Sequence, residues 1–271
     1  MFDTLNEAEW DRVDDAWDLL ESADFEKARV AVDGLIQARG RHPDLALLDA
    51  ALAIEEGRAE YALQGLMDAE SSADPALFFE VRALARFHLV EPDLALEDAE
   101  KALAIRPHMA EAHALLAKIH DFLGDSERSA EHAETAFELD PEDFPLPLEM
   151  DDEAFDALVE GSLNELPERV REALQELPVL VEPMPQREML VAGRPPLPPD
   201  ILGLFVGRHL LEREHNELPG SPGAIYLFRR NLLRIAADRE DLTREVRITV
   251  QHEVGHLLGL DEDDLDAWGL A

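Results

Sequence analysis

Residues 250–262 decide the fold and the chemistry of the C-terminal half, and they read VQHEVGHLLGLDE. This stretch contains the pattern His-Glu-x-x-His, with His252 and His256 four residues apart. Residues at that spacing lie one turn above each other on one face of a helix, so two imidazoles can bind a single metal ion. The carboxylate of Glu253 would then lie beside the metal without binding it, as the candidate catalytic base.

A catalytic zinc site needs a third protein ligand, and a helix that simply continued would carry later side chains away from the metal. Gly259 lies three residues past His256, where a left-handed cap would reverse the backbone. Glu262 follows His252 by ten residues, the position of the third ligand in enzymes with the longer pattern HExxHxxGxxH. We therefore predict His252, His256 and Glu262 as ligands, with Asp261 as the alternative to Glu262 or its neighbouring partner.

The residues around the motif follow a helical pattern. Apolar side chains recur at steps of three and four residues, which predicts an amphipathic helix with one buried face, and they are Val246, Val250, Val254, Leu257 and Leu258. Asp241 or Thr243 is expected to cap the start of this helix. The alternative interpretation is a solvated helix whose two histidines bind nothing.

Composition limits the function further. A chain of 271 residues with 46% hydrophobic residues can build two domains with real cores. The absence of cysteine excludes thiolate ligands, so His, Asp and Glu must hold the expected Zn2+, for which manganese or cobalt is the alternative. The net charge of −37 argues against binding to nucleic acid or to an anionic membrane. We take solubility as the main role of this acidity, while basic partners remain open.

No run of eighteen apolar residues exists, and the first seven residues contain neither a basic leader nor an apolar segment. The sequence therefore predicts a soluble, cytoplasmic protein.

Small residues recur through the N-terminal half at a fixed interval. Ala16, Ala50, Ala83 and Ala117 are separated by 34, 33 and 34 residues. Two further series keep the same intervals, and they are Ala28, Ala62, Ala95, Ser129 and Leu35, Ala69, Ala102, Ala136. This pattern resembles the tetratricopeptide repeat, in which small residues let paired helices approach closely. The resemblance implies four units of two helices over residues 1–141, with a concave face that binds a peptide or protein partner.

Histidines also gather in the last repeat, at His113, His120 and His132. A second metal site is one interpretation, and ordinary packing is the one we favour.

Three prolines between Pro141 and Pro147 end the array and place a domain boundary there. The second domain, residues 142–271, is predicted as a small α+β fold, giving an overall class of a helical-repeat array followed by an α+β domain. Its predicted elements are a helix over 151–174, strands at 179–182, 202–206 and 224–228, the motif helix, and a last turn or helix at 265–270.

From about residue 150 the chain resembles the minimal zincin-like metallopeptidase family. The resemblance is carried by LNELP at 163–167, VLVE at 179–182, LGLFVG at 202–207, IYLFRR at 225–230 and the motif at 250–262. It implies that His252, His256 and Glu262 bind zinc and that Glu253 is the catalytic base. By analogy with larger zincins, Ala224–Phe228 would accept an extended substrate by backbone pairing.

The sequence leaves two functional hypotheses. The favoured one is a zinc-dependent metallopeptidase that hydrolyses peptide bonds through a metal-activated water, with the repeats docking a peptide or protein substrate. The alternative is a repeat-based interaction scaffold with a structural or vestigial zinc site. Candidates for stabilising an oxyanion are Tyr226, His209 and His215, each of which we expect more readily in a structural role.

Overall fold

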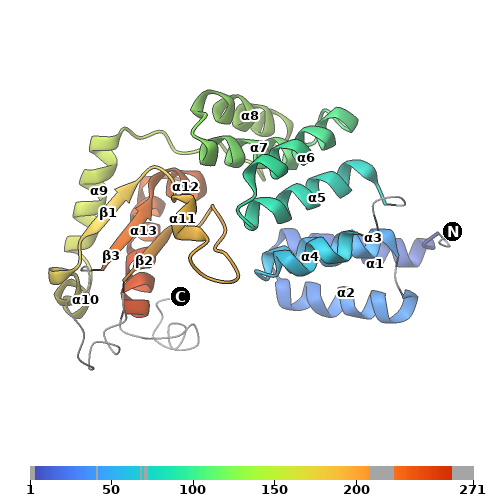
Figure 1. The fold of residues 1–271 in the computed structure, drawn as a ribbon, viewed down its shortest axis with the longest axis horizontal. Helices are drawn as coiled ribbons and strands as arrows, with labels where there is room; N and C mark the ends of the chain where they lie inside the picture. Colours follow the sequence, from blue (N-terminus) through green and yellow to red (C-terminus); the bar gives the residue numbers. More distant parts are fainter. Residues whose placement is uncertain (1–3, 41, 68, 70–72, 208–222, 258–271) are drawn as a thin grey trace. The chain divides into compact units, whose positions relative to one another are not determined.

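A computed structural model describes residues 4–40, 42–67, 69, 73–207 and 223–257 (Figure 1). The chain divides into two compact units, the first comprising Met1–Phe144 and Gly193–Pro198 and the second comprising Pro145–Ala192 and Pro199–Ala271. Whether residues 1–141 and 142–271 are independently folding domains stays a prediction. Within the described ranges, no helix has both the length and the apolar character needed to cross a membrane.

The regular secondary structure of the first unit is helical in its described residues. Its helices are α1 (Glu7–Glu21), α2 (Phe25–Arg39), α3 (Pro43–Glu55), α4 (Ala59–Leu66), α5 (Pro75–His88), α6 (Pro92–Ile105), α7 (Ala110–Leu123) and α8 (Ser126–Leu139). They pack as consecutive pairs, α1 with α2, α3 with α4, α5 with α6 and α7 with α8. This arrangement is consistent with the predicted helical-repeat array of four units, while the specific tetratricopeptide assignment stays a prediction.

The repeated small residues lie where these helices meet. Ala16 and Ala83 are fully buried, and Ala50 and Ala117 are each 2% exposed. A methyl group at such positions lets two helix backbones approach more closely than a larger side chain would. The helix ends are also encoded locally, because proline begins α3, α5 and α6, and Gly124 ends α7 in the left-handed conformation that glycine tolerates.

The first helix of each pair belongs to one continuous layer. Helix α1 contacts α3, α3 contacts α5, and α5 contacts α7. We call α1, α3, α5 and α7 the first-helix layer. Side chains on one face of this layer therefore come from segments that are about 30 residues apart in the sequence but adjacent in space.

The second unit combines helices with a three-stranded sheet. Its elements are α9 (Asp152–Asn164), α10 (Glu168–Ala173), a 3-10 turn (Leu174–Glu176), β1 (Val179–Glu182), α11 (Arg187–Leu190), β2 (Gly203–Val206), β3 (Ala224–Phe228), α12 (Arg229–Ile235) and α13 (Arg239–Leu257). The strand order is β1-β3-β2, with β1 parallel and β2 antiparallel to β3. The predicted α+β class and the three strand positions are confirmed, while the turn at 265–270 lies outside the described residues.

The prediction that Ala224–Phe228 accepts a substrate by backbone pairing is wrong. These residues form β3, the central strand, in which Ile225 is aligned with Val179 of β1 on one side and with Phe205 of β2 on the other. Both edges of β3 are therefore occupied within the described sheet. The outer edge that lies nearest α13 belongs to β2, because α13 contacts β2 as well as β3.

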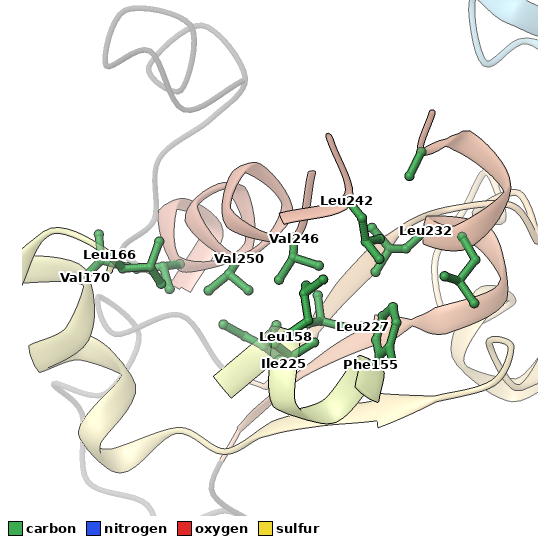
Figure 2. Close-up of a cluster of buried hydrophobic side chains, with 14 of the residues drawn as sticks. Phe155, Leu158, Leu166, Val170, Ile225, Leu227, Leu232, Leu242, Val246 and Val250 are labelled. Carbon is green, nitrogen blue, oxygen red and sulfur yellow. The ribbon is translucent and has the colours of Figure 1, made fainter. Parts of the chain in front are cut away.

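The core of this unit lies between α13, the sheet and α9. Figure 2 shows Val246 and Val250 of α13 directed toward Ile225 of β3 and Leu158 of α9, and all four belong to one buried cluster. Val246 and Val250 are fully buried. Full burial of one valine side chain contributes about 1.5 to 3 kcal/mol. The valine stripe therefore fixes which face of α13 turns away from the core.

The N-terminus of α13 differs from its prediction. Neither Asp241 nor Thr243 caps the helix, since both lie inside its first turns. Asp238 is the cap, because its Oδ1 accepts hydrogen bonds from the backbone N–H of Glu240 and of Asp241 at 2.8 and 2.9 Å. Asp241 instead bonds backwards, accepting the N–H of Ala237 at 2.9 Å. A side chain that receives these otherwise unpaired N–H groups stabilises the helix start, and here that residue stands three positions earlier than expected.

Candidate metal centre

Helix α13 positions the first residues of the motif. The valine stripe faces the core, and the next positions around the helix are therefore turned toward the sheet edge and the surface. His252 is half-buried, and Glu253 is 7% exposed. The predicted base thus lies deeper than the predicted ligand beside it.

The carboxylate of Glu253 contacts the outer edge of β2. Its Oε2 accepts a hydrogen bond from the backbone N–H of Phe205 at 2.6 Å. Antiparallel pairs alternate between hydrogen-bonded and non-hydrogen-bonded positions. Because Phe228 N–H donates to the carbonyl of Leu202 at 2.9 Å, residues 202, 204 and 206 bond to β3, and Gly203 and Phe205 direct their backbone groups outward. Glu253 therefore binds an N–H group on the outer edge of β2, the edge that does not face β3.

Gly203 makes this contact sterically feasible. A Cβ atom at this position would lie 2.5 Å from Thr249 Cγ2 and 3.1 Å from the carbonyl oxygen of Tyr226. Both distances are shorter than an ordinary contact, so a side chain here would push β2 away from α13. The glycine lets the strand lie directly against the helix turn that carries Thr249 and Glu253.

The remaining predicted ligands are described only in part. His256 falls within α13, one turn after His252, as the motif requires, but its side chain lies outside the described part of the structure. Glu262, Asp261 and Gly259 also lie outside the described residues. Among the residues that are described, no group of three or more His, Asp or Glu side chains is arranged to hold a metal ion. The predicted site cannot be found by such a search, because the side chains of His256 and Glu262 lie outside the described residues.

The donor chemistry of the motif nevertheless fits zinc. An α-helix that extends through residues 252 and 256 brings their positions to one face, and imidazole nitrogen is a preferred zinc ligand. The chain contains no thiolate that could compete for the ion. His252, His256 and Glu262 would hold the metal, and the assignment of these residues stays a prediction.

The three oxyanion candidates are not brought together by the described structure. Tyr226 lies in the central strand and is half-buried, and His209 and His215 lie outside the described residues.

The three histidines of the last helix pair contact one another, since His113 Nδ1 lies 2.9 Å from His132 Nδ1 and the ring of His120 stacks on that of His132. They do not form a metal-binding group of three within the described ranges, and ordinary packing remains our interpretation.

Sequence reasoning missed the residues that support Glu253. Nothing in the local sequence of Phe205 marks its N–H as the partner of a carboxylate 48 residues later. Gly203 did carry a usable signal, because a glycine inside a short strand often marks a place where another part of the chain approaches closely.

Comparison with known families agrees with this part of the chain. Residues 174–270 match the family model described as zincin-like metallopeptidase. The matched range contains all three described strands, α13 and the whole motif to Glu262, whereas α9 and α10 precede it. No curated protein matches the chain.

Proposed function

Because residues 174–270 match the zincin-like metallopeptidase family model, we propose that this chain is a zinc-dependent peptidase that uses Glu253 as its catalytic base. The observation that carries the proposal is that Glu253, the residue after His252 on α13, places its carboxylate at the outer edge of β2. The predicted base, a predicted metal ligand and the outer edge of a strand thus belong to neighbouring segments. This combination suits the hydrolysis of an extended peptide.

When bound by His252, His256 and Glu262, zinc supplies a Lewis acid that makes water acidic enough to lose a proton near neutral pH. Glu253 would accept this proton on a carboxylate oxygen while the water oxygen forms a bond to the peptide carbonyl carbon, and it would then transfer the proton to the amine nitrogen, which leaves as the C–N bond breaks. The buried setting of Glu253 restricts competing water and leaves the side chain few alternative positions.

The substrate chain is expected along the outer edge of β2. Gly203 directs its N–H and C=O groups there, and an extended peptide can pair with them. The Phe205 N–H that now binds Glu253 holds the carboxylate next to that edge. The scissile bond would therefore lie within reach of the base.

The test is Glu253→Gln in the full chain. Gln keeps the size of the side chain but cannot accept the proton, so we expect one zinc ion per chain by elemental analysis and at least about a 100-fold loss of turnover on a peptide library. Glu240→Gln, at the exposed start of α13, is the matched control and should retain full activity. A chelator should abolish cleavage by the wild type.

Unchanged turnover in Glu253→Gln would refute the assigned base. A zinc-loaded wild type that cleaves nothing would refute the peptidase and favour the interaction scaffold.

A further inference from the structure

One contact between paired helices is built from different side chains in the last two units. In the pair α5–α6, Arg86 Nη1 donates a hydrogen bond to the fully buried carboxylate of Asp98 at 2.6 Å. The repeat interval of 34 residues leads from Arg86 to His120 of α7. The same interval leads from Asp98 to His132 of α8. These two imidazoles stack, with ring centroids 5.5 Å apart and planes inclined by 5°. An ion pair is thus replaced, one unit later, by two rings whose charge depends on pH.

A third histidine determines which nitrogens of this cluster carry protons. His113 Nε2 lies 3.2 Å from the carbonyl oxygen of Pro107, which can only accept, so this nitrogen is the donor. The neutral ring of His113 therefore has a bare Nδ1, which lies 2.9 Å from His132 Nδ1. His132 must donate in that hydrogen bond. A proton added to His113 would go to its Nδ1 and set two N–H groups against each other, so ionisation of this ring breaks the contact between α7 and α8.

The surroundings of the stacked rings favour their neutral form. Burial, followed by the other two histidines and Arg128, lowers the pKa of His132 to about 4. Burial is also the largest cause of the lowered pKa of His120. The charged groups that face His120 come from α6, α7, α8 and the turn before α8, and they are Asp125, Arg128, Glu100 and Asp121. The three carboxylates favour the charged form of His120, but they do not outweigh burial and Arg128.

Separation of the two helices would remove this burial. The ring of His132 would return to its ordinary pKa of 6.5, so between pH 6.5 and 4 the separated form binds a proton that the packed form does not. The packed form is therefore favoured fully above pH 6.5 and loses this advantage as the pH falls toward 4.

We propose that the packing of α8 on α7 is an acid-sensitive contact, closed while His113, His120 and His132 are neutral and opened when they take up protons. The preceding pair should stay closed over the same range, because an arginine and a carboxylate both keep their charges there. Helix α8 is the last helix of the array, so its release frees the start of the connection to the second unit. The inference concerns the first unit alone and does not depend on the proposed peptidase.

Hydrogen exchange of the full chain at pH 7.5 and at pH 5.5, followed by mass spectrometry and corrected for the intrinsic exchange rates, tests the contact. One ring whose pKa changes from about 4 to 6.5 on opening makes opening about tenfold more favourable over this range. Protection of the α8 amides should therefore fall at least about tenfold, while protection of the α6 amides should change less than twofold.

Replacing the two rings by the residues of the preceding unit should remove the dependence on pH. His120→Arg combined with His132→Asp restores an arginine and a carboxylate at the equivalent positions, and the protection of α8 should then agree within about twofold at the two pH values. His132→Asn is the milder variant. Its amide can still donate to His113 but does not titrate, so most of the fall should disappear.

The control is His108→Asn, at an exposed position before α7, which should keep the full fall in α8 protection. An equal fall in α6 and α8 of the wild type would indicate general acid unfolding and would overturn the proposal. It would also be overturned by unchanged α8 protection in the wild type, or by a full tenfold fall in His132→Asn.

Discussion

Glu80 of the repeat array and Glu253 of the zincin-like domain are buried to a similar extent, 9% and 7% exposed, in opposite surroundings. Glu253 accepts a backbone N–H at 2.6 Å, and a donor of that kind stabilises a carboxylate. Within the described residues Glu80 makes no hydrogen bond, and its burial, followed by the charges of Glu111 and Glu55, raises its pKa to about 8. At similar burial, the presence of a hydrogen-bond donor therefore decides how easily a buried acid keeps its charge.

The largest effect is expected where the array does provide partners. Asp98→Ala removes the carboxylate that Arg82 and Arg86 share and leaves two partly buried cations beside each other. We expect a loss of about 3 to 5 kcal/mol in the free energy of unfolding. Urea unfolding can be followed by tryptophan fluorescence, since Trp10 and Trp17 both lie on α1.

Exposed Glu100→Ala, two residues further along α6, should change that free energy by less than about 0.5 kcal/mol. Equal losses in the two variants would contradict the view that the arginines stabilise the array through Asp98.

Glu80→Gln should have the opposite sign and depend on pH. The pKa of Glu80 is about 8 in the folded chain against an ordinary 4.5, so the folded state binds the extra proton between these values. Its contribution to stability is fully present below pH 4.5 and is lost as pH rises through 8. The variant should therefore be more stable than the wild type by about 2 to 4 kcal/mol at pH 9 and indistinguishable from it at pH 4.

Urea unfolding at the two pH values measures this difference. A gain of the same size at pH 4 would mean that Gln packs better than Glu for reasons unrelated to charge.

The helices of the array were largely predictable, because each helix is marked by residues close to it in the sequence. The 33- and 34-residue intervals placed the buried alanines, and prolines marked the starts of three helices. The convergence of its acids was not predictable. The charge of Glu111 contributes to the raised pKa of Glu21 although the two residues are 90 positions apart, because the distance between α1 and α7 depends on packing between successive helices rather than on any one repeat.

The sequence predicted the helix that carries the site, α13, but not how the neighbouring strands are arranged around it. The four-residue spacing placed His252 and His256 on one helix, and the strand segments were found at the right positions. The order of those strands was not predicted, and the structure places β3 at the centre and β2 at the edge. Strand order is set by contacts between distant segments, and a propensity pattern carries no information about it. The Asp238 cap was missed because Asp238 and Asp241 are both plausible caps by composition.

Gly203→Ala tests the contact that gives Glu253 its partner. The new Cβ would lie 2.5 Å from Thr249 Cγ2, so β2 must move away from α13, and the Phe205 N–H would leave the carboxylate. We expect a loss of about 1 to 3 kcal/mol, the usual effect of overpacking, measured by hydrogen exchange of the β2 and α13 amides. Hydrolysis should fall with it, while zinc content should not.

Two controls separate this clash from a general effect of alanine. Gly161→Ala, on α9, meets nothing within 4 Å and should be neutral or stabilising by up to about 1 kcal/mol, because alanine favours a helix. Thr249→Ser removes the Cγ2 atom, so Gly203→Ala combined with Thr249→Ser should recover part of the lost protection and activity. Strictly additive losses in the double variant would show that β2 and α13 are not coupled at this point, and Glu253 would then owe its position to the helix alone.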